Sequence, residues 1–284
     1  MNHAVLLMHS ADKQGVVLEI SKFIAEHKGN IIELDQYTDT ENKHFFMRVK
    51  WDLADFTIDR AELSSQFEAK VVAQIDMYWK IYFCDKPKRV ALFVTKLSHC
   101  LYDILQRYQS NEWSIEIPCI ISNHDTLRYI AEQFGIPYYV FPITKENKIA
   151  QEANELELLK KHNIDFCVLA RYMQVLTDDF IAHYPSRIIN IHHSSLPAFP
   201  GAKPYHSAFK RGVKIIGATS HYVTADLDEG PIIAQDVTKI THTDSISDLI
   251  RKGKDLEKTV LSQAIWLKIE HKILTYKNKT IVFR

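Results

Sequence analysis

The sequence predicts an α/β protein in which a ferredoxin-like unit of order βαββαβ precedes a doubly wound, mostly parallel sheet. Strand-like and helix-like patterns follow one another in that βαββαβ order over residues 1–84. After a charged, proline-containing linker at 85–89, strands and helices alternate one by one, which is typical of a parallel sheet covered on both faces. At 284 residues the chain is long enough for two domains, 1–84 and 90–284.

In the first domain, apolar side chains at helical spacing predict a helix over 16–27, and Gly29 follows as a stop signal. A second helix is expected over 59–73. The strands are expected at 3–9, 31–38, 44–51 and 77–84.

In the second domain, the expected helices cover 97–108, 127–134 and 149–162, and a last long helix covers 245–276. The strands between them are expected at 89–94, 115–122, 137–141 and 166–170. Four of the eight glycines lie between residues 201 and 230, so the backbone there must turn tightly or approach something closely.

The composition excludes some function classes. Lysine plus arginine and aspartate plus glutamate both total 35, so no net basic field would hold a nucleic acid. No apolar run approaches the ~20 residues that cross a bilayer, so no membrane partner is expected. The cysteines form no CxxC pair and are typical of reduced core residues in a cytoplasmic protein: Cys84, Cys100, Cys119 and Cys167.

Two polar residues stand at the end of a strand-like segment, Arg187 to His193. Strand alternation puts Asn190 and His192 on the same side of the chain, where the strand opens into a loop. Taken alone, a loop-capping asparagine and a hydrogen-bonded core histidine explain this pair equally well.

A second polar cluster lies in segment 215–234, where two strand-like stretches flank an acidic loop. Acids in a turn are usually solvated, but Asp228 has a leucine before it and a Gly-Pro pair two residues on, which give its loop a specified shape. Together the residues suit acyl transfer from an amide-like donor. Asn190 would stabilise the oxyanion, His192 would carry protons, and Asp228 would support the imidazole.

Metal binding and a serine nucleophile are weaker interpretations. The sequence has no HExxH motif and no histidine pair at helical i, i+4 spacing, so no metal is expected at His192, His193, His206 and His221. Ser194 and Ser195 lack the GxSxG elbow that would expose a nucleophile.

These motifs resemble the folate-dependent formyltransferases, which share a strand ending in Asn-x-His, then Ser and Leu-Pro, and a later Leu-Asp-x-Gly-Pro loop. Here they are Asn190-Ile191-His192, Ser195-Leu196-Pro197 and Leu227-Asp228-Glu229-Gly230-Pro231. The resemblance implies a formyltransferase-like fold for residues 90–284, with Asn190, His192 and Asp228 as the catalytic residues.

The same resemblance implies a folate substrate and no cofactor besides it. In that family the pterin pocket is lined by a loop similar to 170–176 and by the loop ending at Asp228. The expected substrate-binding residues are therefore Arg171, Tyr172, Met173, Val175, Leu176, Thr224 and Gly201.

Over essentially the whole chain the similarity is to the deformylase branch of this family. Transferases that act on glycinamide ribonucleotide hold the acceptor's phosphate in a glycine-rich loop, whereas the equivalent residues 94–100, VTKLSHC, contain no glycine. Water is then the implied acceptor and 10-formyltetrahydrofolate the substrate, so the reaction would supply formate for purine synthesis and balance one-carbon pools. Formyl transfer to an amine is the alternative.

The first domain is similar to the ACT domain that precedes the catalytic domain in these deformylases. That likeness implies a homo-oligomer formed by side-by-side pairing, with an amino-acid effector bound near Asp12, Gln14, Gly15 and Asn30. A dimerisation module without a ligand is an equal alternative. A sensor with an inert second domain is disfavoured by the intact catalytic residues.

Overall fold

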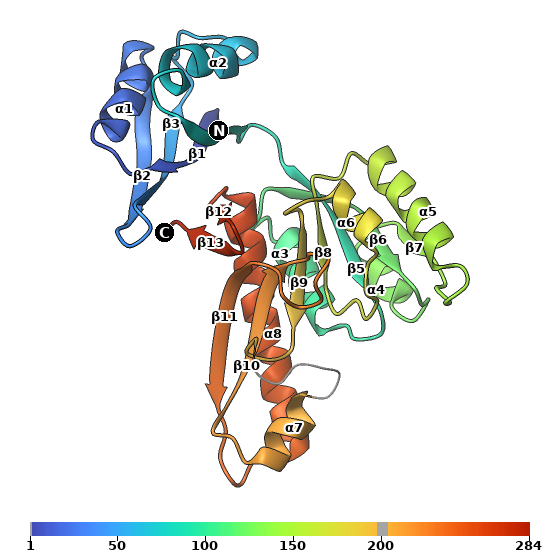
Figure 1. Ribbon diagram of the computed structural model, residues 1–284. Helices are drawn as coiled ribbons and strands as arrows, with labels where there is room; N and C mark the ends of the chain where they lie inside the picture. The colour runs from blue at the N-terminus through green and yellow to red at the C-terminus, as the bar shows by residue number, and fades with distance from the viewer. Residues whose placement is uncertain (1, 198–203) are drawn as a thin grey trace. The chain divides into compact units, whose positions relative to one another are not determined.

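The computed structural model describes residues 2–197 and 204–284 and divides into two compact units (Figure 1). The first unit holds the described residues of Met1–Pro87, Glu270–Leu274 and Ile281–Arg284, and the second those of Lys88–Ile269 and Thr275–Thr280. Among the described residues, no helix combines the length and apolar composition that a membrane span requires. The four cysteines form no disulfide; Cys100, Cys119 and Cys167 are buried as predicted, whereas Cys84 is half-buried.

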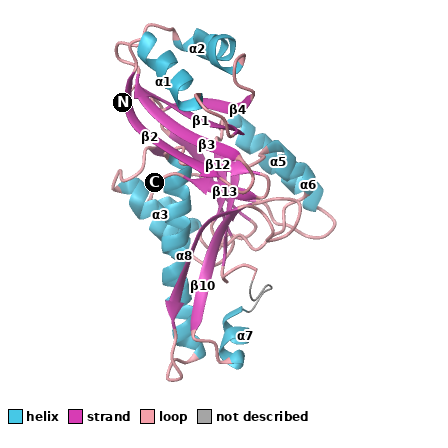
Figure 2. Cartoon of the chain, turned by 60° about the vertical axis from the view of Figure 1, so that its left-hand side comes forward, coloured by secondary structure: helices cyan, strands magenta, loops and turns pink. Residues whose placement is uncertain are grey.

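The first unit is an antiparallel sheet of order β2-β3-β1-β4 with α1 and α2 on one face (Figure 2). Apolar residues of both helices, such as Phe23 and Phe67, pack into one core with the strands. The order βαββαβ is the predicted one. The elements are β1 (His3–Ala11), α1 (Val16–Glu26), β2 (Asn30–Asp39), β3 (His44–Asp52), α2 (Arg60–Phe67) with a π-helical turn at Glu68–Val72, and β4 (Met77–Phe83).

The four predicted effector residues lie at two ends of this sheet. Asp12, Gln14 and Gly15 form the turn after β1, whereas Asn30 begins β2. The last residue of β1 pairs with His44, the first residue of β3, whereas Asn30 pairs with Asp52, the last residue of β3. The turn after β1 and Asn30 are therefore separated by the length of β3, about 27 Å at ~3.4 Å per residue. One chain alone therefore does not bring them together around a single small ligand.

A buried arginine attaches the end of the chain to the first unit. The guanidinium of Arg48 donates to the carbonyls of His271 (3.0 Å) and Glu270 (3.1 Å) and to the carboxylate of Glu33 (2.6 Å). A buried guanidinium needs such acceptors for its five donors. The predicted assignment of all residues from 90 to 284 to the second domain therefore differs from the structure, in which two C-terminal segments group with the first unit.

The second unit is a seven-stranded sheet of order β11-β10-β9-β8-β5-β6-β7. It is parallel from β9 to β7 and antiparallel at β10 and β11, which confirms the mostly parallel sheet. Its elements are β5 (Lys88–Val94), α3 (His99–Gln109), β6 (Ile115–Ser122), α4 (Arg128–Gln133), β7 (Tyr138–Val140), α5 (Lys148–Lys161), β8 (Phe166–Leu169), α6 (Asp178–His183), β9 (Ile188–His192), α7 (Pro204–Arg211), β10 (Ile215–Tyr222), β11 (Ile232–Lys239) and α8 (Ile246–Ile269).

The chain order of the strands reverses between β5 and β8. In open α/β sheets the crevice beyond the carboxyl ends of strands at such a reversal is where ligands bind. The predicted linker at 85–89 is shorter in the structure, because Lys88 and Arg89 already belong to β5 and pair with β6.

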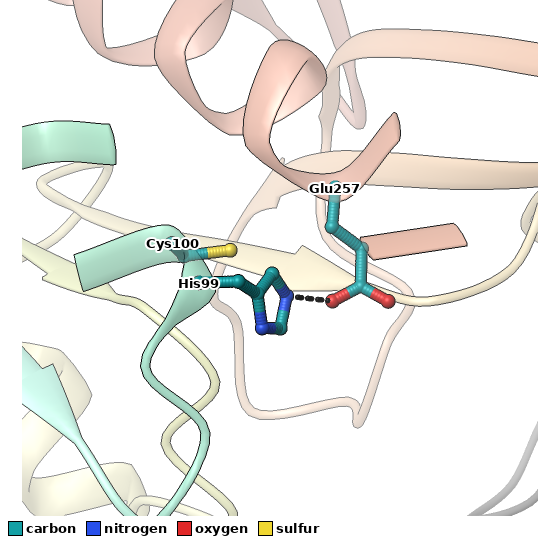
Figure 3. A group of neighbouring side chains, drawn as sticks. All are labelled: His99, Cys100 and Glu257. Carbon is teal, nitrogen blue, oxygen red and sulfur yellow. Dashed lines mark hydrogen bonds and ion pairs between the residues drawn. The ribbon is translucent and has the colours of Figure 1, made fainter. Parts of the chain in front are cut away.

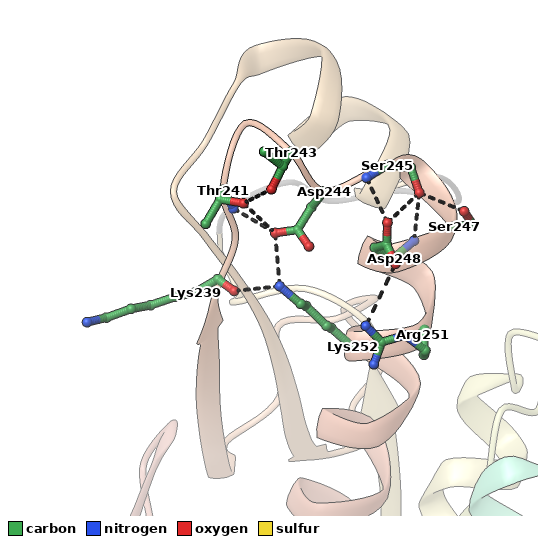
Figure 4. A network of polar contacts seen from close by, with 9 residues as sticks. All are labelled: Lys239, Thr241, Thr243, Asp244, Ser245, Ser247, Asp248, Arg251 and Lys252. Atoms are coloured by element: carbon green, nitrogen blue, oxygen red, sulfur yellow. Dashed lines mark hydrogen bonds and ion pairs between the residues drawn. The ribbon is translucent and has the colours of Figure 1, made fainter.

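The start of α8 is fixed by a reciprocal cap (Figure 4). The hydroxyl of Ser245 accepts from the backbone N–H of Asp248 (3.2 Å), and the Asp248 carboxylate accepts from the backbone N–H of Ser245 (3.0 Å). Lys252 adds a bond to Asp244 (2.9 Å). This capping-box geometry satisfies donors that a helix start leaves free, and it holds α8 where the helix packs against β10 and β11.

The predicted helix over 245–276 is wrong at its end. The structure ends α8 at Ile269 and forms a hairpin of β12 (Ile273–Tyr276) and β13 (Lys279–Val282). His271 has a left-handed backbone (φ +51°), which terminates a helix. Three of the four residues of β12 are β-branched or aromatic, namely Ile273, Thr275 and Tyr276, and β12 pairs with β13, so strand pairing overrides the helical spacing.

Two buried glutamates of α5 hold the segment between β8 and α6. Glu152 accepts from the backbone N–H (3.2 Å) and hydroxyl of Thr177, and Glu155 accepts from the hydroxyl of Tyr172 (3.3 Å). Burial raises the pKa of Glu155 to about 8 although the Tyr172 bond lowers it, so this carboxyl is a neutral acid at neutral pH. The two contacts fix both ends of segment 171–177.

We expect Glu155→Gln to change how stability depends on pH. In the unfolded chain this carboxyl has its ordinary pKa of 4.5, so the stability that the raised folded pKa contributes is full below that pH and is lost as the pH rises toward about 8. A glutamine cannot ionise. The free energy of unfolding of the variant should therefore gain roughly 2–4 kcal/mol relative to the unchanged protein across that window, measured by urea denaturation. Glu157→Gln, on the exposed side of α5, is the control. If the free energy of unfolding of Glu155→Gln varies with pH in the same way as that of the unchanged protein, Glu155 is not the neutral acid described here.

Candidate active site

Polar side chains from β9, β10 and the loop between β10 and β11 meet at a pocket of about 310 Å³. Asn190 and His192 come from β9. His221 on β10 pairs directly with Asn190 in the register of the sheet, and Asp228 comes from the loop. The structure thus brings the three predicted catalytic residues to one pocket, within the second unit.

Asp228 stands between two imidazoles. One carboxylate oxygen lies 3.2 Å from Nδ1 of His192, and the other lies 3.7 Å from Nε2 of His221. The hydrogen bond from His192, and then the nearby imidazole of His221, hold the pKa of Asp228 well below its usual range, against the effect of partial burial. Asp228 is therefore an anion at neutral pH.

The loop of Asp228 has a shape that its sequence requires. Asp228 has a left-handed backbone (φ +58°), which asparagine and aspartate tolerate better than most residues. A Cβ at Gly230 would lie 1.8 Å from the carbonyl oxygen of Tyr222, so only glycine fits there. The hydroxyl of Thr224 donates to the carbonyl of Asp226 (3.1 Å) and closes the turn.

His192 has one engaged and one free ring nitrogen. Because Nδ1 faces a carboxylate, it carries the proton in the neutral ring, which leaves the lone pair on Nε2. Nε2 is buried and has no hydrogen-bond partner among the described residues. A buried polar atom of this kind in a pocket wall is what a substrate oxygen or a water molecule would satisfy.

His221 is a site residue that the sequence interpretation missed, since it was considered only as a metal ligand. Its Nδ1 faces the carbonyl of Tyr222 (2.9 Å) and so carries the proton, and its Nε2 then accepts from the Asn190 amide (3.2 Å). His221 thereby fixes which way that amide points. The signal for it lay in the strand-like segment 215–222, but its register against β9 was needed to place it beside Asn190.

The expected substrate-binding residues divide into six that line the pocket and one that cannot be placed. Pocket-lining residues are Arg171, Tyr172, Met173, Val175, Leu176 and Thr224. Gly201 lies outside the described residues. The backbone N–H of Met173 donates to the hydroxyl of Thr95 (3.0 Å), which attaches this loop to the end of β5. An apolar wall with few fixed polar groups is typical of a small-molecule site.

A second cluster, His99, Cys100 and Glu257, has donor atoms within 4.8 Å of one another (Figure 3). It fits a metal ion poorly. Burial, together with the charge of Glu257, raises the pKa of the Cys100 thiol well above its usual value. The guanidinium of Arg171 lies 3.5 Å from the same carboxylate and would repel a second cation. The cluster is therefore a buried ion group, in which His99 donates to Glu257 over 2.8 Å.

Comparisons with known proteins agree with this geometry. The formyl transferase family model matches residues 88–265, from the first residue of β5 to within α8. The formyltetrahydrofolate deformylase of Synechocystis sp. is 54% identical over 280 residues, which cover 99% of this chain and 98% of that protein.

Solved structures of deformylases and formyltransferases are also similar to this chain. A formyltetrahydrofolate deformylase from Pseudomonas syringae pv. tomato has a TM-score of 0.96 and 42% identity, covering 100% of this chain and 95% of its own. A phosphoribosylglycinamide formyltransferase from Anaplasma phagocytophilum has a TM-score of 0.64 and 29% identity, covering 69% of this chain and 95% of its own. The chain belongs to the formyltetrahydrofolate deformylase family.

Proposed function

We propose that this chain hydrolyses 10-formyltetrahydrofolate to formate and tetrahydrofolate, with Asn190, His192 and Asp228 as its catalytic residues. One observation carries the proposal: a single anionic carboxylate faces two imidazoles in one pocket, and one of these imidazoles holds the Asn190 amide. Membership of the deformylase family supports the reaction and its substrate. We place the reaction in the cytoplasm, and because folate is the substrate the proposal includes no cofactor.

The first step is attack by water on the formyl carbon. With Nδ1–H held by Asp228, Nε2 of His192 can accept a proton from the attacking water, and the carboxylate stabilises the imidazolium that results. The new O–C bond turns the formyl oxygen into an oxyanion. One N–H of the Asn190 amide is held by His221, and the other can donate to this oxygen, a role worth about 10²–10³ in rate.

The second step breaks the bond between the formyl carbon and N10. Nε2 of His192 returns its proton to that nitrogen as the carbonyl re-forms, which releases tetrahydrofolate. Formic acid gives its remaining acidic proton to solvent and leaves as formate. His192 thus acts first as base and then as acid, and Asp228 remains ionised throughout.

The reaction is tested by mixing the purified protein with 10-formyltetrahydrofolate and no amine. We expect formate and tetrahydrofolate to appear in equal amounts, well above a buffer blank. Adding phosphoribosylglycinamide should neither be required nor yield a formylated product. Turnover that begins only when an amine acceptor is present would support the alternative, formyl transfer, and reject hydrolysis.

Asp228→Asn should separate catalysis from binding. The side-chain shape is kept while the charge that supports His192 is lost, so we expect kcat to fall by about 10²–10⁴-fold. The dissociation constant for tetrahydrofolate, measured by fluorescence titration, should change only a few-fold. Asp226→Asn, an exposed acid of the same loop, is the matched control and should retain activity. A near-normal kcat in Asp228→Asn would show that the acid is misassigned.

We further propose that the first unit is an ACT domain and that the protein is a homo-oligomer through it. The four-stranded sheet and its two helices support this assignment. Because Asp12 and Asn30 lie at opposite ends of that sheet, an amino acid that touches both residues would have to bind between two copies.

Analytical ultracentrifugation combined with amino-acid titration tests the oligomer and the effector together. We expect an oligomer in solution and an effector whose binding is weakened by both Asp12→Ala and Asn30→Ala. A monomer in solution would contradict the proposed pairing. An unchanged rate and an unchanged Tm with every amino acid tested would contradict the proposed effector.

A further inference from the structure

The carboxylate of Glu257 is buried, with three donors around it. It accepts from Nε2 of His99 (2.8 Å) and from the hydroxyl of Tyr205 (2.6 Å), and Nε of Arg171 lies 3.5 Å away. Glu257 is only 1% exposed. Its neighbour Gly253, one turn earlier in α8, leaves the space that the Tyr205 ring occupies, since a Cβ there would lie 2.2 Å from the Tyr205 hydroxyl.

This ion group lies directly behind the wall of the substrate pocket. Arg171 itself lines the pocket. The ring of Tyr205 lies edge-on to His193, another lining residue, with centroids 5.9 Å apart. His99 begins α3, an 11-residue helix whose N-cap, Ser98, makes no side-chain capping bond. The first turn of such a helix favours negative charge.

The group therefore has the composition of an anion site. A guanidinium, an imidazole and a hydroxyl surround one negative charge, and that charge belongs to the protein. Burial opposes ionisation of Glu257, but the bond from His99, the charge of Arg171 and the bond from Tyr205 lower its pKa below the usual value. Among the described residues that line the pocket, Arg171 is the one lysine or arginine, and Glu257 balances its charge.

We propose that Glu257 is a specificity-determining residue. Its own carboxylate takes the place of a bound anion, so that the phosphate of an acceptor finds no unpaired cation beside the pocket. The proposal deepens the proposed hydrolysis and rests on it. A fold-level relative, at 29% identity, carries the name of a transferase whose acceptor has a phosphoribosyl group. Such an acceptor needs a counter-charge for its phosphate. With Arg171 already paired, water is the acceptor that remains.

The test is the phosphate dependence of thermal unfolding, which does not involve turnover. In Glu257→Gln the carboxylate is replaced by a neutral group of the same shape, which frees Arg171 to bind inorganic phosphate. We expect millimolar phosphate to raise the Tm of this variant by roughly 2–4 °C over chloride at equal ionic strength. The unchanged protein and Glu257→Asp, which keeps the charge, should show no such shift.

Glu116→Gln is the matched control, because it frees Arg89 from its partner at the surface instead of in the buried group. It should behave as the unchanged protein does. The same shift in this control or in the unchanged protein, or no shift in Glu257→Gln, would overturn the proposal. If Glu257→Gln does not fold in chloride, cooperative unfolding regained in phosphate supports the proposal, and its absence contradicts it. Loss of hydrolysis affects none of these readouts.

Discussion

The hydrogen bond between the carboxylate of Asp228 and Nδ1 of His192 is the interaction on which the pocket depends. It places the ring proton on Nδ1 and leaves Nε2 free for a reactant. The same carboxylate faces His221, which in turn orients the amide of Asn190. The bond is possible because a glycine at position 230 lets the loop pass close to the backbone of β10.

Three carboxyl groups of the second unit differ in ionisation because their neighbouring groups differ. Asp228 is ionised because two imidazoles face it, and Glu257 is ionised because a histidine, an arginine and a tyrosine surround it. Among the described residues, Glu155 has the hydroxyl of Tyr172 as its one hydrogen-bond partner, and burial keeps Glu155 neutral at neutral pH. Asp228 faces the pocket, Glu257 holds Arg171, and the neutral Glu155 holds the loop that lines the pocket.

Much of the fold and of the candidate site could be predicted from the sequence because it depends on short-range patterns. The bounds of the strands follow from the pattern of apolar and polar residues. Asn190 and His192 are two residues apart in a strand, which places their side chains on the same side. His221 could not be assigned, since its place beside Asn190 depends on the register of two strands. The Glu257 group could not be foreseen either, because it joins α3, α7, α8 and the loop after β8. The end of α8 was mispredicted because strand pairing competed with helical spacing.

The protonation of His192 tests the central claim most directly. In protein labelled with ¹⁵N at histidine, long-range ¹H–¹⁵N spectra at neutral pH distinguish a ring protonated at Nδ1 from one protonated at Nε2. With Asp228 accepting from Nδ1, the spectrum of His192 should show protonated Nδ1 and bare Nε2, and Asp228→Asn should lose this preference. A ring protonated at Nε2 alone would contradict the account.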